Sequence, residues 1–189
     1  MSFAFLRTLL AGLSLLTCTS LFATPLVVDV TGIQSRGFFG DPENTVLSFD
    51  IGANATVVRI GYAVGLTATD PSFLSEIGVA LTDSALTGGV FVAPGFNAPF
   101  PGSSVYTGFA TLAELGLEFQ VGGDGILRLE FFEFFDDFFP DADGQWDFGT
   151  ITIDYEAAQA VPEPASLLLM GAGLGLLACT RRRRLPGKR

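Results

Sequence analysis

Apolar and polar residues alternate through the middle of the chain, and this period of two limits the fold more than any other feature of the sequence. In Thr45–Ile51, for example, Leu47 and Phe49 fall on one side of an extended chain and Ser48 falls on the other. The same alternation predicts seven strands, at Leu26–Val30, Thr45–Ile51, Thr56–Tyr62, Ile77–Thr82, Leu115–Val121, Leu127–Phe131 and Gly149–Tyr155. Turns containing glycine and proline separate these strands. We therefore expect an all-β fold, an antiparallel β-sandwich or jelly roll.

One helix and one long loop complete the expected fold. Thr111–Leu117 is the only helical candidate. Thr87–Gly108 is rich in proline and glycine, and this composition predicts a surface excursion without a strand. The sequence shows no internal repeat.

The N-terminal end has the composition of a secretory signal peptide. Met1–Ala23 carries a positive charge at Arg7, an apolar stretch after it, and a small residue at the cleavage point, Ala23. Cleavage after Ser20 is an alternative. We therefore expect one extracytoplasmic β-sandwich domain, residues 24–160, between two targeting segments.

The C-terminal segment, residues 161–189, predicts a membrane anchor. The run Ala165–Thr180 has no charge and the leucine-rich composition of a lipid-facing helix. At a rise of 1.5 Å per residue it spans roughly 24 Å, less than the ~30 Å hydrocarbon core, so its flanks would have to reach the interfaces. A basic tail, residues 181–189, begins with the four orientation determinants Arg181, Arg182, Arg183 and Arg184. Such clusters stay in the cytoplasm, which places the domain outside the inner membrane.

A short motif before the apolar run carries a family resemblance. The sequence Val161, Pro162, Glu163, Pro164, followed by the apolar helix and the arginine cluster, resembles the PEP-CTERM sorting signal of Gram-negative bacteria that make exopolysaccharide. The resemblance implies an exosortase as partner, which recognises the tail and cleaves it near the Pro-Glu-Pro triplet. With the signal peptide, it implies Sec export, inner-membrane anchoring with the body in the periplasm, and then transfer to the cell surface or extracellular matrix. A plain tail anchor is the alternative.

Charge is distributed unevenly between the ends and the middle of the chain. Residues 24–160 hold three arginines and nineteen acidic residues, a net charge of −16. Such a surface repels phosphate backbones, so we expect no nucleic-acid partner, and it favours divalent cations. Both cysteines, Cys18 and Cys179, lie in the targeting segments, so the core alone must stabilise the domain.

The residue types of the domain exclude most catalytic chemistry. The chain has no histidine, and residues 24–160 have neither lysine nor cysteine, which removes histidine bases, Schiff-base lysines and thiol nucleophiles. Carboxylates remain, and they leave glycoside hydrolysis open with Glu130 or Glu133 as the candidate acid. Such residues are more often the solvated face of a strand, and we expect no enzyme.

Phenylalanines and aspartates are concentrated in residues 129–147. Six phenylalanines between Phe131 and Phe139 predict a strand buried on both faces, and the alternative is that some rings are exposed for stacking on sugars or for self-association. Carboxylates of one loop are candidate Ca²⁺ ligands, because calcium binds oxygen atoms of acidic loops and D-x-D-G is a fragment of such sites. These residues are Asp136, Asp137, Asp141, Asp143 and Asp147. A solvated acidic hairpin loop is the alternative, and we expect no other cofactor.

The domain also resembles the jelly-roll P-domain of proprotein convertases. The similar segments are Asp41–Ile51, Val57–Thr67, Ser72–Thr82, Gly125–Phe131 and Asp141–Ile153. The resemblance implies a stabilising or binding module, and the calcium-binding aspartates of that family have no clear counterparts here. A sandwich pattern shared by unrelated proteins is the alternative.

Together these observations predict an exported surface or extracellular-matrix protein of the exopolysaccharide layer. Its domain is expected to be a non-catalytic structural or binding module, with exopolysaccharide as a candidate partner. The alternatives are a Ca²⁺-assisted, lectin-like carbohydrate-binding module and a carboxylate glycosidase. A third, ice binding, has little support, because the domain has no regular ladder of Thr-x-Thr repeats to extend the pair Thr150 and Thr152.

Overall fold

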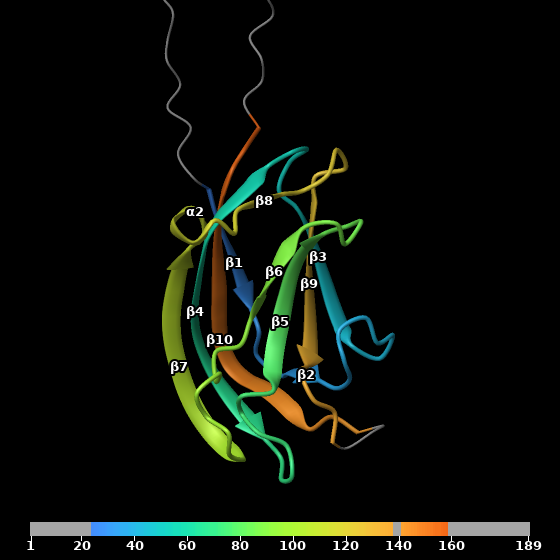
Figure 1. The fold of residues 1–189 in the computed structure, drawn as a ribbon, viewed down its shortest axis with the longest axis vertical. Helices are drawn as coiled ribbons and strands as arrows, with labels where there is room; N and C mark the ends of the chain where they lie inside the picture. Colours follow the sequence, from blue (N-terminus) through green and yellow to red (C-terminus); the bar gives the residue numbers. More distant parts are fainter. Residues whose placement is uncertain (1–23, 138–140, 159–189) are drawn as a thin grey trace, which may run out of the picture. The chain divides into compact units, whose positions relative to one another are not determined.

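The computed structural model describes residues 24–137 and 141–158, and these residues form an almost entirely β fold, as the alternation predicts (Figure 1). The elements are β1 (Thr24–Asp29), β2 (Ile33–Ser35), β3 (Thr45–Asp50), β4 (Thr56–Ala68), β5 (Ile77–Asp83), β6 (Gly89–Val92), β7 (Gly102–Thr111), α2 (Leu112–Leu115), β8 (Phe119–Gln120), β9 (Ile126–Glu133) and β10 (Gly144–Glu156). All strand pairs are antiparallel.

Two sheets face each other across one core (Figure 1). The first has the order β1-β10-β4-β7, with β2 paired to β10 and β8 paired to β4, and the second has the order β3-β9-β5-β6. Alternate side chains of both sheets point inward, which is the arrangement that a period of two produces. Phe131 and Trp146 meet edge-to-face in this core, with ring centroids 5.2 Å apart. Trp146 Nε1 donates a hydrogen bond to Ser35 Oγ at 3.1 Å, so the buried indole keeps a polar partner.

The prediction of a strandless excursion at Thr87–Gly108 is wrong. The segment contains β6 and most of β7. The sequence of β7 does not alternate between apolar and polar residues, because its outward residues include Val105 and Phe109 and both of its faces hold apolar side chains. The prolines of the segment lie in the turn between β6 and β7, while Gly108 lies within β7 opposite Tyr62.

The predicted strand Leu115–Val121 is also wrong. Its first residue ends α2, a single turn inside the expected helix Thr111–Leu117, and Gly116 ends this turn in the left-handed region at φ 67°. Only Phe119–Gln120 pairs as a strand, β8, against β4. The alternation of Leu115, Leu117 and Phe119 therefore comes from a helix end followed by a short strand.

Within residues 24–137 and 141–158, no helix has the length and apolar character needed to cross a membrane. The predicted signal peptide Met1–Ala23 and the predicted helix Ala165–Thr180 lie outside the described residues, and both stay predictions. The described residues belong to one compact unit, which ends at Ala158.

Candidate functional site

The outward side of the first sheet presents a surface that we call the Phe148 face. It is built from alternate residues of four neighbouring strands, which the strand register brings side by side. The face consists of Val27, Phe148, Thr150, Thr152, Gly61, Ala63, Gly65, Val105, Thr107 and Phe109. The inward neighbours of the same strands, such as Ile60, Val64 and Ile151, lie in the core.

A β-bulge and a glycine position the ring of Phe148. The pairing of β10 with β4 shifts between Trp146 and Phe148, so Phe148 pairs with Gly65 on the outward side. A Cβ placed on Gly65 would lie 2.4 Å from Cε1 and 2.6 Å from Cζ of Phe148. The ring therefore lies directly on the backbone of Gly65, while 51% of the residue stays exposed. This arrangement presents an aromatic ring supported from below by the sheet.

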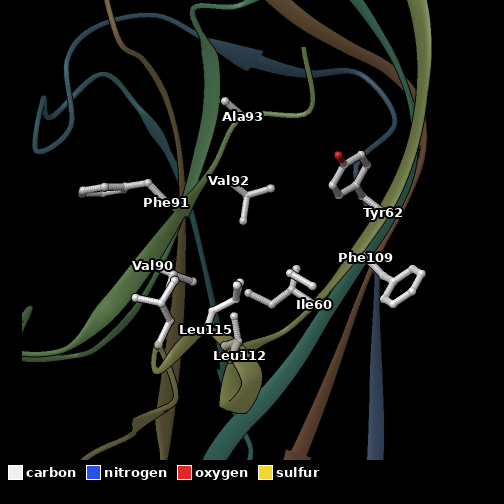
Figure 2. Close-up of a pocket in the computed structure, with 11 residues that line it drawn as sticks. Ile60, Tyr62, Val90, Phe91, Val92, Ala93, Phe109, Leu112 and Leu115 are labelled. Atoms are coloured by element: carbon white, nitrogen blue, oxygen red, sulfur yellow. The ribbon is translucent and has the colours of Figure 1, made fainter. Parts of the chain in front are cut away.

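The middle strand of the Phe148 face has small side chains, and its neighbours have larger ones. Gly61 pairs with Thr152 on one side and with Phe109 on the other. Ala63 likewise lies between Thr150 and Thr107. β4 therefore presents small side chains between the threonines of β10 and β7, and the Phe148 ring covers β4 at Gly65. Phe109 is 76% exposed, and Figure 2 shows it pointing away from the core.

Charges lie at the two ends of the Phe148 face and along its β1 edge. At one end Arg59 pairs with Asp154, with 2.5 Å between Nη2 and Oδ2. At the other end the hydroxyl of Thr67 lies 2.6 Å from Ser103 Oγ and donates to Asp147 Oδ2 at 2.7 Å. The ten residues of the face are not ionisable, but the exposed Asp29 of β1 pairs with Thr150 and lies on the same side of the sheet.

The phenylalanines of residues 131–139 divide among different surroundings. Phe131 lies in the core, as predicted, while Phe134 and Phe135 are exposed. Phe132 points to the outer side of the second sheet and is covered by other rings. These rings make edge-to-face contacts with centroids 4.7 to 6.3 Å apart, and we call the group the aromatic cluster: Phe39, Phe91, Phe132 and Phe134. Phe138 and Phe139 lie outside the described residues.

Glu130 was expected to be solvated or to act as an acid, and the structure places it fully buried in a different role. Its Oε1 accepts hydrogen bonds from the backbone N–H of Gly40 at 2.6 Å and from Asn44 Nδ2 at 2.7 Å. Its Oε2 lies 2.6 Å from Arg128 Nη2. The carboxylate therefore holds the loop between β2 and β3 against the second sheet.

Glu133 is fully buried on the inner side of the same strand, so the expectation of a solvated position is wrong here too. Neither of its carboxylate oxygens has a hydrogen-bond partner. Burial, together with the negative charges of Asp143, Glu76 and other acidic side chains, raises the pKa of Glu133 to about 10. Because Glu130 and Glu133 stand on opposite faces of β9, they do not form a pair of carboxylates around one site.

The five aspartates predicted as calcium ligands do not share one environment. Asp143 is almost fully buried and its Oδ2 accepts a hydrogen bond from the backbone N–H of Asp137 at 3.2 Å. Asp147 lies in β10 and pairs with Thr67, and Asp141 is exposed. Asp136 contributes, with its neighbours, to the negative charge around Glu133. In the described part of the chain, no three acidic side chains form a group that could hold a metal ion as they stand.

A cavity of about 270 Å³ opens between the two sheets beside β6 (Figure 2). Ile60, Val90, Val92, Leu112 and Leu115 turn toward it, and its lining is largely apolar. Phe91 and Phe109 lie at its rim and point outward, onto the outer faces of the two sheets.

The residues of the predicted sorting signal lie outside the described residues, so the structure gives no geometry for Val161–Pro164 or for Arg181–Arg184. Comparison with known families does reach them. The family model described as the PEP-CTERM protein-sorting motif matches residues 160–184. The chain carries a PEP-CTERM sorting motif.

The PEP-CTERM motif includes the tetrapeptide Val161–Pro164, the apolar run Ala165–Thr180 and the arginines Arg181–Arg184 that were predicted to act together. It implies an exosortase as the processing partner, and export followed by sorting to the cell surface. No curated protein matches the chain. The motif therefore identifies a destination, and the activity of the PEP-CTERM protein's body must be inferred from its own surface.

Sequence reasoning did not find the Phe148 face, although the sequence contains a signal for it. In Gly149–Tyr155 the core residues are Ile151 and Ile153, so Phe148 is out of phase with them and must point outward. In β4 the outward positions hold Gly61, Ala63 and Gly65 between large inward residues. These two signals predict that the ring of Phe148 lies on β4 only when the register of β10 against β4 is known.

Proposed function

We propose that this PEP-CTERM protein is an exported, exosortase-processed surface protein whose body binds neutral polysaccharide through the Phe148 face. The body acts without catalysis. The apolar helix retains the chain in the inner membrane, the exosortase acts near Pro162–Pro164, and the body is then displayed in the exopolysaccharide layer.

One observation carries the binding proposal: the ring of Phe148 lies on Gly65 with half of its residue exposed. A ring held against a sheet offers its exposed surface to the C–H groups of a sugar ring, and it loses little conformational entropy on binding because it is already fixed. Phe109 offers a second exposed ring, four residues or about 13 Å farther along the strand direction and two strands or about 10 Å across the sheet from Phe148. Two rings at this separation suit a polymer more than a single sugar.

The polar groups of the face support the same partner. Thr107, Thr150 and Thr152 supply hydroxyls that donate and accept hydrogen bonds, as sugar hydroxyls do. The centre of the face has no ionisable side chain, the exposed Asp29 lies at its β1 edge, and the rest of the domain is strongly acidic. An anionic polymer would be repelled by this surrounding charge, and a neutral one would not.

The strand orders support a binding module. Orders β1-β10-β4-β7 and β3-β9-β5-β6 give eight strands that pass repeatedly between two sheets, which is the connectivity of a jelly roll. A jelly roll is also what the resemblance to the P-domain implies. The absence of a catalytic role is supported by Glu130, whose carboxylate is engaged with Asn44 and Arg128, and by the opposite orientation of Glu133.

Binding of the full-length protein to a panel of neutral polysaccharides, including the exopolysaccharide of its host, tests the proposal. We expect Phe148→Ala and Phe109→Ala each to weaken binding about tenfold, the loss of one stacked ring. Phe96→Ala is the matched control, because Phe96 is 74% exposed but lies in the loop between β6 and β7. Absence of binding to every polysaccharide, or an equal loss in the control, would contradict the proposal.

A pair of glycine variants tests whether binding requires the Phe148 ring to lie in its observed position, and not only to be present. Gly65→Ala places a methyl group where the Phe148 ring lies, so the ring must move and binding is expected to fall as in Phe148→Ala. Gly61→Ala lies on the same strand and the same face, and the nearest atom to its new Cβ is 3.7 Å away. We expect this second variant to bind like the unmodified protein. Equal affinities of the two variants would show that the supported ring plays no part.

A further inference from the structure

Two buried carboxylates lie close together where β9 ends and β10 begins. A Cβ on Gly144 would fall 2.1 Å from Oε1 of Glu133, so this carboxyl group lies against the backbone of the residue that follows Asp143. Glu133 is fully buried and Asp143 is 1% exposed. Gly144 thus provides the space that the carboxyl group of Glu133 occupies.

Three oxygen atoms of this pair have no hydrogen-bond partner. They are both carboxylate oxygens of Glu133 and Oδ1 of Asp143, and all three are buried. A buried carboxylate without a donor is costly, and two beside each other are more so. Native proteins rarely leave such groups unsatisfied, so three together indicate a missing positive partner.

Further carboxylates surround the pair. Glu76 is held at the end of β9, because its backbone oxygen accepts a hydrogen bond from Phe134 N at 2.8 Å and its Oε2 accepts from Ser72 Oγ at 3.0 Å. Asp137 donates its backbone N–H to Asp143. The charges of Glu76, Asp136 and Asp137 all act on Glu133 in the direction that disfavours its ionised form.

We propose that Glu133 and Asp143 are the inner ligands of a Ca²⁺ site at this end of the sandwich. The partner is a hard divalent cation, because the available donors are carboxylate and carbonyl oxygens and the domain has neither histidine nor cysteine. Calcium takes six to eight oxygen ligands, and backbone carbonyls, water and the nearby acidic side chains supply the rest. This assignment replaces the loop of five aspartates with a buried pair, of which only Asp143 was among the predicted ligands.

The proposed site starts from two buried carboxylates, which agrees with the finding that no three acidic side chains of the described residues are already grouped around one point. Two buried carboxylates form the fixed part of the site, and the cation draws in the neighbouring carboxylates of Glu76, Asp136 and Asp137. The pKa of Glu133, raised to about 10, is the consequence expected when such a pair has no counter-ion. The inference is independent of the Phe148 face, which belongs to the outer side of the first sheet.

Calcium titration of the full-length protein after treatment with chelator tests the site, by thermal unfolding and by calorimetry. At a free calcium concentration 100-fold above the dissociation constant, we expect the Tm to rise by about 5–10 °C. Glu133→Gln and Asp143→Asn should abolish this rise. Glu133→Gln replaces a buried carboxyl group that holds its proton with a neutral amide of similar volume, so it should remain folded without calcium.

Asp141→Asn is the matched control, because Asp141 is an exposed carboxylate of the same loop and was predicted as a ligand. It should retain the calcium response. The proposal is overturned if the unmodified protein shows no response by either method. It is equally overturned if the response survives Glu133→Gln or Asp143→Asn, or if Asp141→Asn abolishes it.

Discussion

At the scale of single residues, the same side chain type takes opposite roles according to the face of the strand that it occupies. Glu130 and Glu133 are three positions apart in β9, so one points outward and the other inward. The outward Glu130 contacts Arg128 and Asn44 beneath a loop, whereas the inward Glu133 lies near other carboxylates. Their different chemistry follows from these neighbours, and the sequence pattern alone treats them alike.

The buried carboxyl group of Glu133 should make stability depend on pH when calcium is absent. The pKa of this group is about 10 in the folded protein and near 4.5 in the unfolded chain, so between these values the folded state holds a proton that the unfolded state has lost. The free energy of unfolding is therefore expected to fall as pH rises from about 5, by up to about 1.4 kcal/mol per pH unit from this group. The stabilisation that this protonated group gives to the folded state is fully present only below the unfolded-state pKa of 4.5.

Urea unfolding at pH 5, 7 and 8.5 in the presence of chelator measures this effect. Glu133→Gln has no titrating group at the position, so its stability should exceed that of the unmodified protein by a margin that grows with pH. Parallel pH profiles for the two proteins would show that the carboxyl group is not held in its protonated form.

At the scale of elements, alternation reveals strands that have one polar face and conceals those that do not. β3 and the end of β10 were predictable because polar residues alternate with core residues in both. β7 was not, since its outward face carries Val105 and Phe109. The Phe148 face could not be predicted for a related reason: it depends on the register of β10 against β4 and on a bulge, neither of which leaves a local signal.

The aromatic cluster acts as a second, smaller core on the outer side of β5 and β9. Phe132 is 3% exposed beneath the rings of Phe39, Phe91 and Phe134, and all seven residues of β5 are buried. The prediction that this segment is buried on both faces therefore holds for Phe131 and Phe132. It fails for Phe134 and Phe135, which follow the end of the strand and are exposed.

Removal of the central ring of this cluster should be costly. We expect Phe132→Ala to lower the free energy of unfolding by about 3 kcal/mol, because it leaves a cavity between packed rings. Phe135→Ala, a deletion of a ring that is 56% exposed three residues later, should change it by less than about 0.5 kcal/mol. Urea unfolding of both variants makes the comparison, and a similar loss in the two would mean that the cluster is not a packed unit.

At the scale of the whole molecule, the chain combines a sorting motif with a domain that carries the proposed binding surface. The PEP-CTERM motif at residues 160–184 implies export and exosortase sorting, and the sequence was sufficient to predict it because the signal is linear. The binding surface and the carboxylate pair required the fold, because they join residues that are far apart in the chain, such as Gly65 with Phe148 and Glu76 with Glu133. The sorting signal can thus be predicted from the sequence, whereas the proposed binding surface can be described only once the packing of the sheets is known.

The claim that the rest depends on is removal of the C-terminal segment by an exosortase, and intact mass measures it directly. The protein would be isolated from its native host and from the same host without the exosortase. The account predicts a shorter product ending near Pro164 in the first case, and a chain that retains Arg189 in the second. A mass that retains Arg189 in both hosts would contradict the account, since the body would then remain on an ordinary membrane anchor.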